Sequence, residues 1–274
     1  MKRLIIFLAL VLIVAAGCKE KKPADYTRLG FYTQYQTYME KLNGKVESVT
    51  EKGYWAIPEG DTYVKGARLT RKDLDSIGYT YDYKVVFDAS GDLVSSATMD
   101  ENDKVTGTWN LSKANDLLAR AVFISNDTTR WKNVITCDAE GNPVLHEIYN
   151  ATADTLVQKV ELEGSYFNDT MTVHYFNHKG EPGAKDMIMF NKLGLLTNSE
   201  SYMKDGTPGS SYNYVYNDKG FQSEFTAFDK DKKMTAKTST SYEYDEKGNW
   251  IKGIIKDQKG FTIICERVYT YFEE

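Results

Sequence analysis

The sequence predicts an all-β protein, an antiparallel meander of tandem β-hairpin repeats that forms a single-layer or curled sheet with a short N-terminal helix. Three observations predict this class. A turn motif recurs along the chain, tyrosines alternate with other residues beside it, and aromatic residues are abundant, with 20 Tyr, 12 Phe and 4 Trp against 5 Pro. Aromatic residues favour strands, and a period of two places alternate side chains on one face of a strand.

The turn motif consists of an aromatic residue, Asp or Asn, two variable residues and Gly. It occurs at Phe87–Gly91, Phe176–Gly180, Phe190–Gly194, Tyr216–Gly220 and Tyr244–Gly248, and Cys137–Gly141 is a copy with Cys in the aromatic position. Composition alone would give about 0.3 strict matches, so the five strict copies indicate a repeat. The Asp or Asn side chain can bond the backbone two residues on, and Gly supplies the positive φ that ends a type I turn with a bulge. Each copy is therefore expected to be a hairpin tip.

Weaker turns lie about midway between these copies, so a full repeat comprises two strands and two turns. They are Lys204–Gly206, Asp229–Lys233 and Asp257–Gly260. Tandem hairpins of this kind can form a single-layer sheet, a wrapped shell or a barrel, and the period of the repeat does not decide between them.

The chain begins with a segment typical of a secretory signal. Lys2-Arg3 precedes an apolar run over residues 4–14, and small residues at positions 15–17 lead to Cys18. The run is shorter than the roughly 20 apolar residues that a transmembrane helix needs. The segment ending at Cys18 resembles the lipobox of bacterial lipoproteins. This resemblance implies that residues 1–17 are a signal peptide and that Cys18 carries the lipid.

The remaining chain divides into three parts. Residues 18–26 are predicted to be a lipidated tether, because they are short, polar and contain Pro23. Residues 27–79 are predicted to hold a short amphipathic helix over Gly30–Leu42, a strand from Lys45 to Ile57 and a second short helix over Arg68–Ile77. Residues 80–274 form the repeat region, in which Ser112–Ala121 fits either a helix or a strand.

Two segments of the repeat region carry a family resemblance. Tyr214–Phe221 and Tyr242–Trp250 resemble the tyrosine–aspartate repeats of the Rhs/YD-repeat family, and the resemblance extends over about residues 80–274. Rhs proteins use such repeats as β-shells that enclose a toxin, a role that we do not expect for this shorter chain. The chain is more similar to small repeat lipoproteins of Bacteroidota, and that similarity implies no biochemical activity.

The sequence offers no pattern for catalysis or metal binding. His174 and His178 are four residues apart, but they lie on a strand followed by a turn, where that spacing does not align two ligands. Ser201–Lys204 matches Ser-x-x-Lys, whereas the other two elements of those enzymes do not occur in the sequence. We expect no metal, no cofactor and no enzymatic activity. An envelope enzyme such as a glycoside hydrolase stays an alternative, because the separation of two carboxylates is a three-dimensional fact.

Cys137 and Cys265 lie in apolar strand-like runs, where a lone Cys behaves as a small hydrophobe. Two buried thiols are therefore expected. A disulfide is the alternative, because an oxidising compartment would allow one.

Charge and address restrict the partners. Removal of residues 1–17 removes Lys2 and Arg3 and moves the net charge from −5 to −7, which disfavours nucleic acid. We expect a membrane-anchored binding or scaffolding lipoprotein of the cell envelope, on the outer membrane and facing the periplasm, with envelope proteins or glycans as partners. A carrier of a lipid or other apolar ligand in a curled sheet is the alternative. An apolar concave face would favour the carrier.

Two sets of residues are candidate sites. A stacking platform for a ligand is predicted from rings that share strand faces, namely Tyr214, Tyr216, Tyr242, Tyr244 and Trp250. Cross-strand packing is the competing interpretation, in which each aromatic pair adds roughly 0.2–1 kcal/mol to the sheet. Four positions resemble the O-glycosylation signal of Bacteroidota, Asp followed by Ser or Thr and then an apolar residue or Thr. They are Ser76, Thr128, Thr155 and Thr170.

Overall fold

The computed structural model describes residues 26–29, 40–77, 82–115, 118–125, 128–139, 143–164 and 170–273. These residues form nineteen strands and one helix. The elements are β1 (Tyr26–Leu29), β2 (Glu40–Asn43), β3 (Val46–Glu59), β4 (Thr62–Arg68), α2 (Arg71–Ile77), β5 (Tyr83–Phe87), β6 (Leu93–Met99), β7 (Val105–Asn115), β8 (Leu118–Ser125), β9 (Thr128–Cys137), β10 (Pro143–Asn150), β11 (Thr155–Gly164), β12 (Thr170–Asn177), β13 (Pro182–Phe190), β14 (Leu196–Tyr202), β15 (Pro208–Tyr216), β16 (Gln222–Phe228), β17 (Met234–Tyr244), β18 (Trp250–Asp257) and β19 (Thr262–Tyr271).

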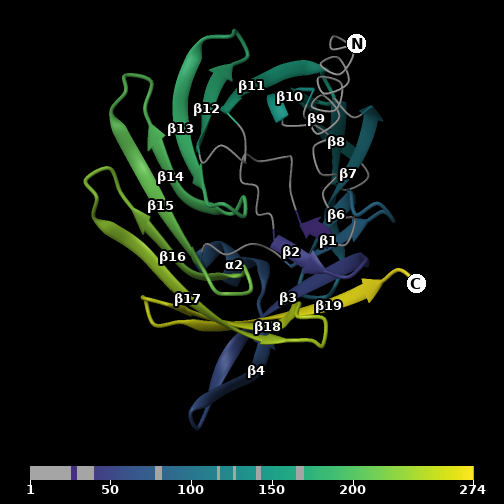
Figure 1. Cartoon of the computed structure of the whole chain (residues 1–274), viewed down its shortest axis with the longest axis vertical. Helices are drawn as coiled ribbons and strands as arrows, with labels where there is room; N and C mark the ends of the chain where they lie inside the picture. Colours follow the sequence, from purple (N-terminus) through teal and green to yellow (C-terminus); the bar gives the residue numbers. More distant parts are fainter. Residues whose placement is uncertain are drawn as a thin grey trace, which may run out of the picture.

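Sixteen of these strands close into an antiparallel barrel (Figure 1). Strands β5 to β19 pair in chain order, and β3 joins the two ends by pairing with β19 and with β5. The predicted single-layer or curled meander is therefore wrong. Closure pairs the N–H and C=O groups that the two edge strands of an open sheet would expose. It depends on contacts between distant residues such as Val49 and Tyr269, which a local repeat does not encode.

The turn motif forms the hairpin tips that the sequence predicts. The five motif glycines have φ between 73° and 85°. In each turn the Gly N–H donates to the carbonyl of the Asp or Asn three residues earlier, at 2.8–3.0 Å. In the copy at Tyr244–Gly248, Asp245 Oδ1 accepts from the backbone N–H groups of Lys247 and Asn249 at 3.0 and 2.8 Å. The side chain and the glycine therefore act together to reverse the chain.

The N-terminal part departs from the prediction at one end and follows it at the other. Residues 40–43, predicted to end a helix, form strand β2 and pair with β1; residues 30–39 lie outside the described residues. The strand predicted from Lys45 corresponds to β3, and residues 112–115 and 118–121 belong to strands β7 and β8.

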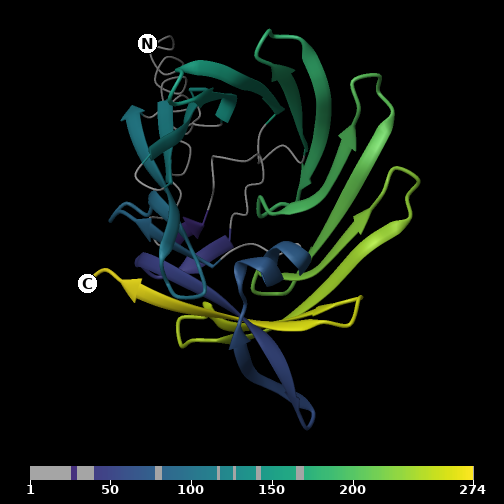
Figure 2. The same ribbon diagram turned by 180° about the vertical axis from the view of Figure 1, so that it is seen from behind.

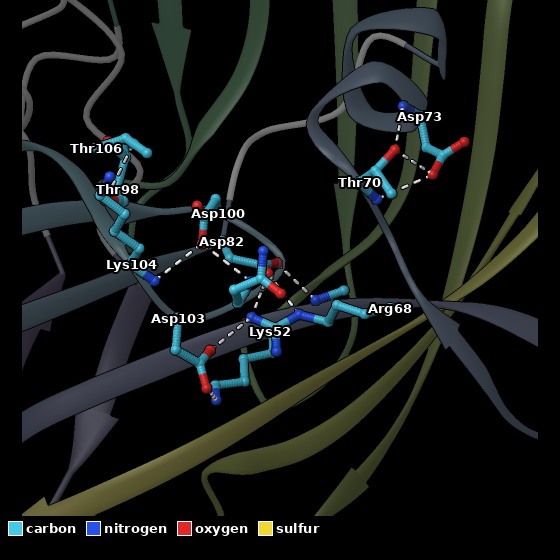
Figure 3. Close-up of polar contacts among 12 residues, drawn as sticks. Lys52, Arg68, Thr70, Asp73, Asp82, Thr98, Asp100, Asp103, Lys104 and Thr106 are labelled. Atoms are coloured by element: carbon cyan, nitrogen blue, oxygen red, sulfur yellow. Dashed lines mark hydrogen bonds and ion pairs between the residues drawn. The ribbon is translucent and has the colours of Figure 1, made fainter.

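The second predicted helix is confirmed as α2, which begins at Arg71 rather than Arg68. Thr70 caps it, because its Oγ1 accepts from the Asp73 N–H at 3.2 Å while Asp73 Oδ2 accepts from the Thr70 N–H at 2.9 Å (Figure 3). This reciprocal pair is a capping box. The hydrogen bonds from Thr70 lower the pKa of Asp73.

Strand β3 changes partner along its length, and a carboxylate fills the junction. Residues 48–51 pair with β5 and residues 54–59 with β4, so the end of β3 and β4 form an arm outside the ring (Figure 1). At the change of partner, the Gly53 N–H donates to Asp82 Oδ1 at 2.7 Å, and Arg68 Nε donates to Asp82 Oδ2 at 2.7 Å (Figure 3). Burial raises the pKa of Asp82 although Arg68 opposes the rise. Asp103 extends the network from Arg68 to Lys52.

The apolar core lies on the inner face of the barrel wall. Helix α2 and strands β1 and β2 lie within the ring in both views (Figures 1 and 2). Leu74 of α2 packs in one cluster with Trp250 and Ile263, and Leu42 of β2 packs with Val49. Trp250 points inward, and so does Tyr244, its partner on β17. Because side chains alternate along a strand, the residues next to them in sequence on these strands point outward.

We expect Gly248→Val to lower the free energy of unfolding by about 1 kcal/mol or more, because a β-branched residue resists positive φ. Gly248 has φ of 84°, and an added Cβ would lie 3.3 Å from Asn43 Nδ2. Chemical denaturation followed by circular dichroism measures the change. Gly248→Asn is the control and should cost less, because Asn tolerates the left-handed region. Equal losses for the two variants would contradict a backbone origin.

Candidate functional site: the two faces of the barrel wall

The predicted platform residues lie on the inner face. Tyr214 is opposite Phe225, Tyr242 is opposite Gly253 and Tyr244 is opposite Trp250. Tyr214 and Trp250 are only 5% and 4% exposed. The five rings therefore share the inward face, where Tyr214 and Trp250 are buried and offer no exposed platform. The reason is closure, which turns the aromatic face of each hairpin towards the core. Ligand binding by these residues stays a prediction.

The tyrosine hydroxyl groups connect one repeat to the next. Tyr216 donates to the carbonyl of Leu196 at 2.7 Å, Tyr242 to that of Gln222 at 2.6 Å, and Tyr269 to that of Trp250 at 2.9 Å. Each acceptor comes two residues after the turn glycine of the preceding repeat. The period of the sequence therefore places a hydrogen bond at the same point of successive hairpins.

Two turn lysines lie over the rings of Tyr244 and Tyr271, which are the last tyrosines of their strands. Lys219 Nζ lies 4.8 Å from the ring centroid of Tyr244, and Lys247 Nζ lies 4.6 Å from that of Tyr271, which are cation–π distances. Burial raises the pKa of Tyr244 and raises that of Tyr271 to about 12. Both phenols therefore stay neutral at physiological pH, and their hydroxyl groups bond the turn residues Asn217 and Asp245 of the preceding repeats.

A buried ion pair, which the sequence reasoning missed, lies on the same inner face. Arg267 Nε donates to Glu51 Oε2 at 2.8 Å, and their side chains are 4% and 8% exposed. Tyr83 joins the pair by donating to Glu51 Oε2 at 2.6 Å and accepting from Arg267 Nη2 at 2.8 Å. The guanidinium lies 3.8 Å from the ring centroid of Trp250. The available signal was an Arg two residues after Cys265, on the strand face that otherwise carries Ile263, Cys265, Tyr269 and Tyr271.

The described residues contain no group of three or more His, Cys, Asp or Glu side chains placed to hold a metal ion. Burial lowers the pKa of His146 to about 4, which keeps this inner-face imidazole neutral. His174 lies on the outward face, 3.5 Å from Glu163. Cys137 and Cys265 lie on β9 and β19, and both are thiols.

The outward face is charged. Glu243, Lys252, Glu266 and Lys52 are successive register partners across β17, β18, β19 and β3, so acids and bases alternate along one row. Lys252 Nζ lies 2.8 Å from Glu243 Oε1. The same pattern recurs on other strands, with ion pairs Lys237–Glu224 at 2.9 Å and Lys159–Glu161 at 2.7 Å.

A shallow hollow of about 460 Å³ lies on this outward face across β10, β11 and β12. Its lining includes Leu145, Lys159, Glu161, His174 and Phe176. Lys159 Nζ lies 5.7 Å from the ring centroid of Phe176. The hollow thus combines one aromatic ring with charges of both signs.

The candidate modification sites divide between described and undescribed parts of the chain. Ser76 lies on α2, and Thr128, Thr155 and Thr170 are the first residues of β9, β11 and β12; all four are exposed. O-glycosylation of these residues stays a prediction. Cys18 lies outside the described residues, so its lipidation also stays a prediction. Within the described residues, no helix is long and apolar enough to cross a membrane.

Comparison with solved structures concerns the fold. A porin-like protein from Bacteroides uniformis ATCC 8492 superposes with a TM-score of 0.50 at 9% identity, over 82% of this chain and 96% of that chain. A porin-like protein from Bacteroides vulgatus ATCC 8482 gives a TM-score of 0.48 at 10% identity, over 83% of this chain and 100% of that chain. No protein-family model and no curated protein matches the sequence. The resemblance to YD repeats stays a prediction.

We expect Arg267→Met to lower the free energy of unfolding by about 3–5 kcal/mol, because it leaves Glu51 buried without its cation. The double variant Glu51→Gln, Arg267→Met should recover part of that loss, since the two side chains are coupled. Denaturant titration measures both. Lys252→Met is the matched control, because the exposed pair that it breaks is worth about 0–1 kcal/mol. Similar losses for Arg267→Met and Lys252→Met would refute the distinction between the two faces.

Proposed function

We propose that this chain is a non-catalytic barrel protein of the cell envelope. In this proposal a lipid on Cys18 holds it at the outer membrane on the periplasmic side, and its outward face binds envelope proteins or glycans. The observation that supports this most is the distribution of side chains between the two faces. The inward face carries the buried apolar and aromatic clusters, and the outward face carries rows of ion pairs with single exposed apolar side chains such as Val215 and Val268 between them.

This distribution is the reverse of that in barrels whose strands cross a membrane. Such barrels present an apolar band with aromatic girdles to the lipid and keep their polar residues inside. A Lys facing lipid at the middle of the bilayer costs about 2–4 kcal/mol. Lys52 and Glu266 point outward from the middle of the paired part of two adjacent strands, and Lys252 points outward beside Glu266. Although a porin-like protein is among the structural neighbours, we infer that the wall of this barrel stands in water.

In the described residues, the inner face around Trp250 and Val49 favours neither a pore nor the carrier considered from the sequence. Leu42, Leu69 and Leu74 come from β2, from the end of the β4 arm and from α2, and each is 3% exposed or less. These side chains cover the apolar inner face around Trp250 and around Val49 with the protein's own residues. Ligand binding in this proposal therefore falls to the outward face, where the hollow around Phe176 offers a ring for stacking and charged groups for hydrogen bonds.

We expect a lipid-free form to leave the membrane. Residues 19–274 exported behind a cleavable signal without the lipobox cysteine should enter the aqueous phase of a Triton X-114 partition, because the outward face is charged. The wild-type lipoprotein should enter the detergent phase, and the difference between the two forms measures the contribution of the lipid. A lipid-free form that still enters the detergent phase would mean that the strands themselves contact lipid.

The binding half of the proposal is tested on the same lipid-free protein. Phe176→Ala should weaken binding to immobilised envelope glycans or envelope proteins about fivefold, because loss of a stacking ring removes about 1 kcal/mol. Biolayer interferometry measures the affinity. Val215→Ala is the control, since Val215 is 50% exposed on the outward face of β15 and lies outside the hollow. Binding that survives Phe176→Ala unchanged would exclude the hollow as the contact.

A further inference from the structure

The residue that follows the turn glycine differs among the repeats, and in the last three copies along the chain it is buried. Leu195 and Phe221 occupy this position in two neighbouring copies, and both are buried apolar side chains. The copy at Tyr244–Gly248 has Asn249 instead, and Asn249 is fully buried. A buried amide in an apolar position needs hydrogen-bond partners, or its burial costs free energy.

Asn249 finds these partners on the N-terminal segment. Its Oδ1 accepts from the Asn43 backbone N–H at 2.7 Å, and its Nδ2 donates to the Asn43 carbonyl at 2.9 Å. Nδ2 also lies 3.0 Å from the hydroxyl of Tyr271. The side chain therefore pairs with Asn43 as a strand backbone would. Leu42, the preceding residue, is 0% exposed in the core.

This contact joins the N-terminal segment to a particular rim of the barrel. Successive turns alternate between two rims, because each antiparallel strand runs from one rim to the other. The first rim carries turns 88–92, 191–195, 217–221 and 245–249, and the opposite rim carries turns 203–207, 229–233 and 257–261. Asn249 belongs to the first rim. Tyr26 is the register partner of Asn43, so β1 begins next to the same rim.

The length of the tether then limits how the barrel can stand on a membrane. Eight residue steps separate Cys18 from Tyr26, and an extended chain spans at most about 29 Å over eight steps. Strand β18 has 8 residues, so the opposite rim lies up to about 26 Å further along the wall. The arm of β3 and β4 also extends past the last pairing of β3 with β19, at Trp55 and Ile263. If the membrane lay against the opposite rim, the tether would have to be almost fully extended along the wall. The arm of β3 and β4 would then lie between that rim and the membrane.

We propose that Asn249 latches the N-terminal segment to the first rim, so that this rim faces the lipid surface and the arm of β3 and β4 points away from it. The inference rests on the proposed lipid anchor at Cys18. Without the latch, the chain between Cys18 and Val46 would have 28 steps, or about 95 Å of reach, and would impose no orientation.

Fluorescence quenching on vesicles tests the orientation. The lipidated full chain, in a Cys137→Ser background, carries a fluorophore on Glu246→Cys at the first rim or on Asp231→Cys at the opposite rim; both positions are exposed. The background protein, in which Cys265 is 1% exposed, should take up no label. On phosphatidylethanolamine–phosphatidylglycerol vesicles with nitroxide headgroups, quenching should be at least twofold stronger at position 246. Equal quenching, or stronger quenching at position 231, would overturn the proposal.

The latch itself is tested by Asn249→Leu, which installs the residue that the Leu195 copy already accommodates. The difference in quenching between the two rims should disappear, and backbone hydrogen exchange over residues 42–46 should accelerate at least tenfold. Asn249→Asp is a second variant that keeps the acceptor for the Asn43 N–H and should give intermediate exchange. An Asn249→Leu protein that folds and keeps both the quenching difference and slow exchange would refute the latch.

Flotation of the wild-type chain with the vesicles separates the two proposals. A chain that does not float refutes the lipid anchor and the orientation with it, whereas the exchange measurement still decides whether Asn249 holds the segment. A chain that floats without a preferred rim keeps the anchor and refutes the orientation.

Discussion

The pairing of β3 with both β19 and β5 is the constraint on which the rest of the structure depends. It joins the two ends of the wall and leaves every strand of the wall with two neighbours. Once the ladder is closed, each strand must have one face towards the interior and one towards the surroundings, and a shift of one residue would exchange them. The Asp82 carboxylate completes this closure, because it accepts from the Gly53 N–H where β3 changes partner.

The aromatic residues of the repeat stabilise this closed wall by connecting successive hairpins. A tyrosine ring is large enough to fill the inner face, and its hydroxyl reaches the backbone of the preceding repeat, as Tyr216 and Tyr242 do. Phenylalanine would fill the same space and lose the hydrogen bond. The abundance of Tyr therefore has a structural cause, since each residue supplies both core packing and a hydrogen bond. The rings that the sequence suggested for ligand binding pack in the core instead.

Charge behaves differently on the two faces. Outside, acids and bases alternate in rows such as Glu243, Lys252 and Glu266, where water screens each pair and solubility is the main gain. Inside, Arg267 and Glu51 are desolvated, and their bonds to each other, to Tyr83 and to the Trp250 ring must offset that cost. The outward pairs therefore contribute little to stability, whereas the inward pair joins the strands at which the barrel closes.

The sequence by itself determined the local structure. The Asp or Asn and the Gly of each motif specified the hairpin tips, because their hydrogen bonds and positive φ arise within five residues. Thr70 and Asp73 specified the start of α2 in the same way. Alternation also predicted that Tyr242, Tyr244 and Trp250 share a face, since register follows from the turn. Only the tertiary structure decided that this face points inward, that Glu51 meets Arg267 across 216 residues, and that Asn249 holds Asn43 across 206. These contacts depend on closure, and closure is a pairing between the two ends of the sheet that no local pattern can specify.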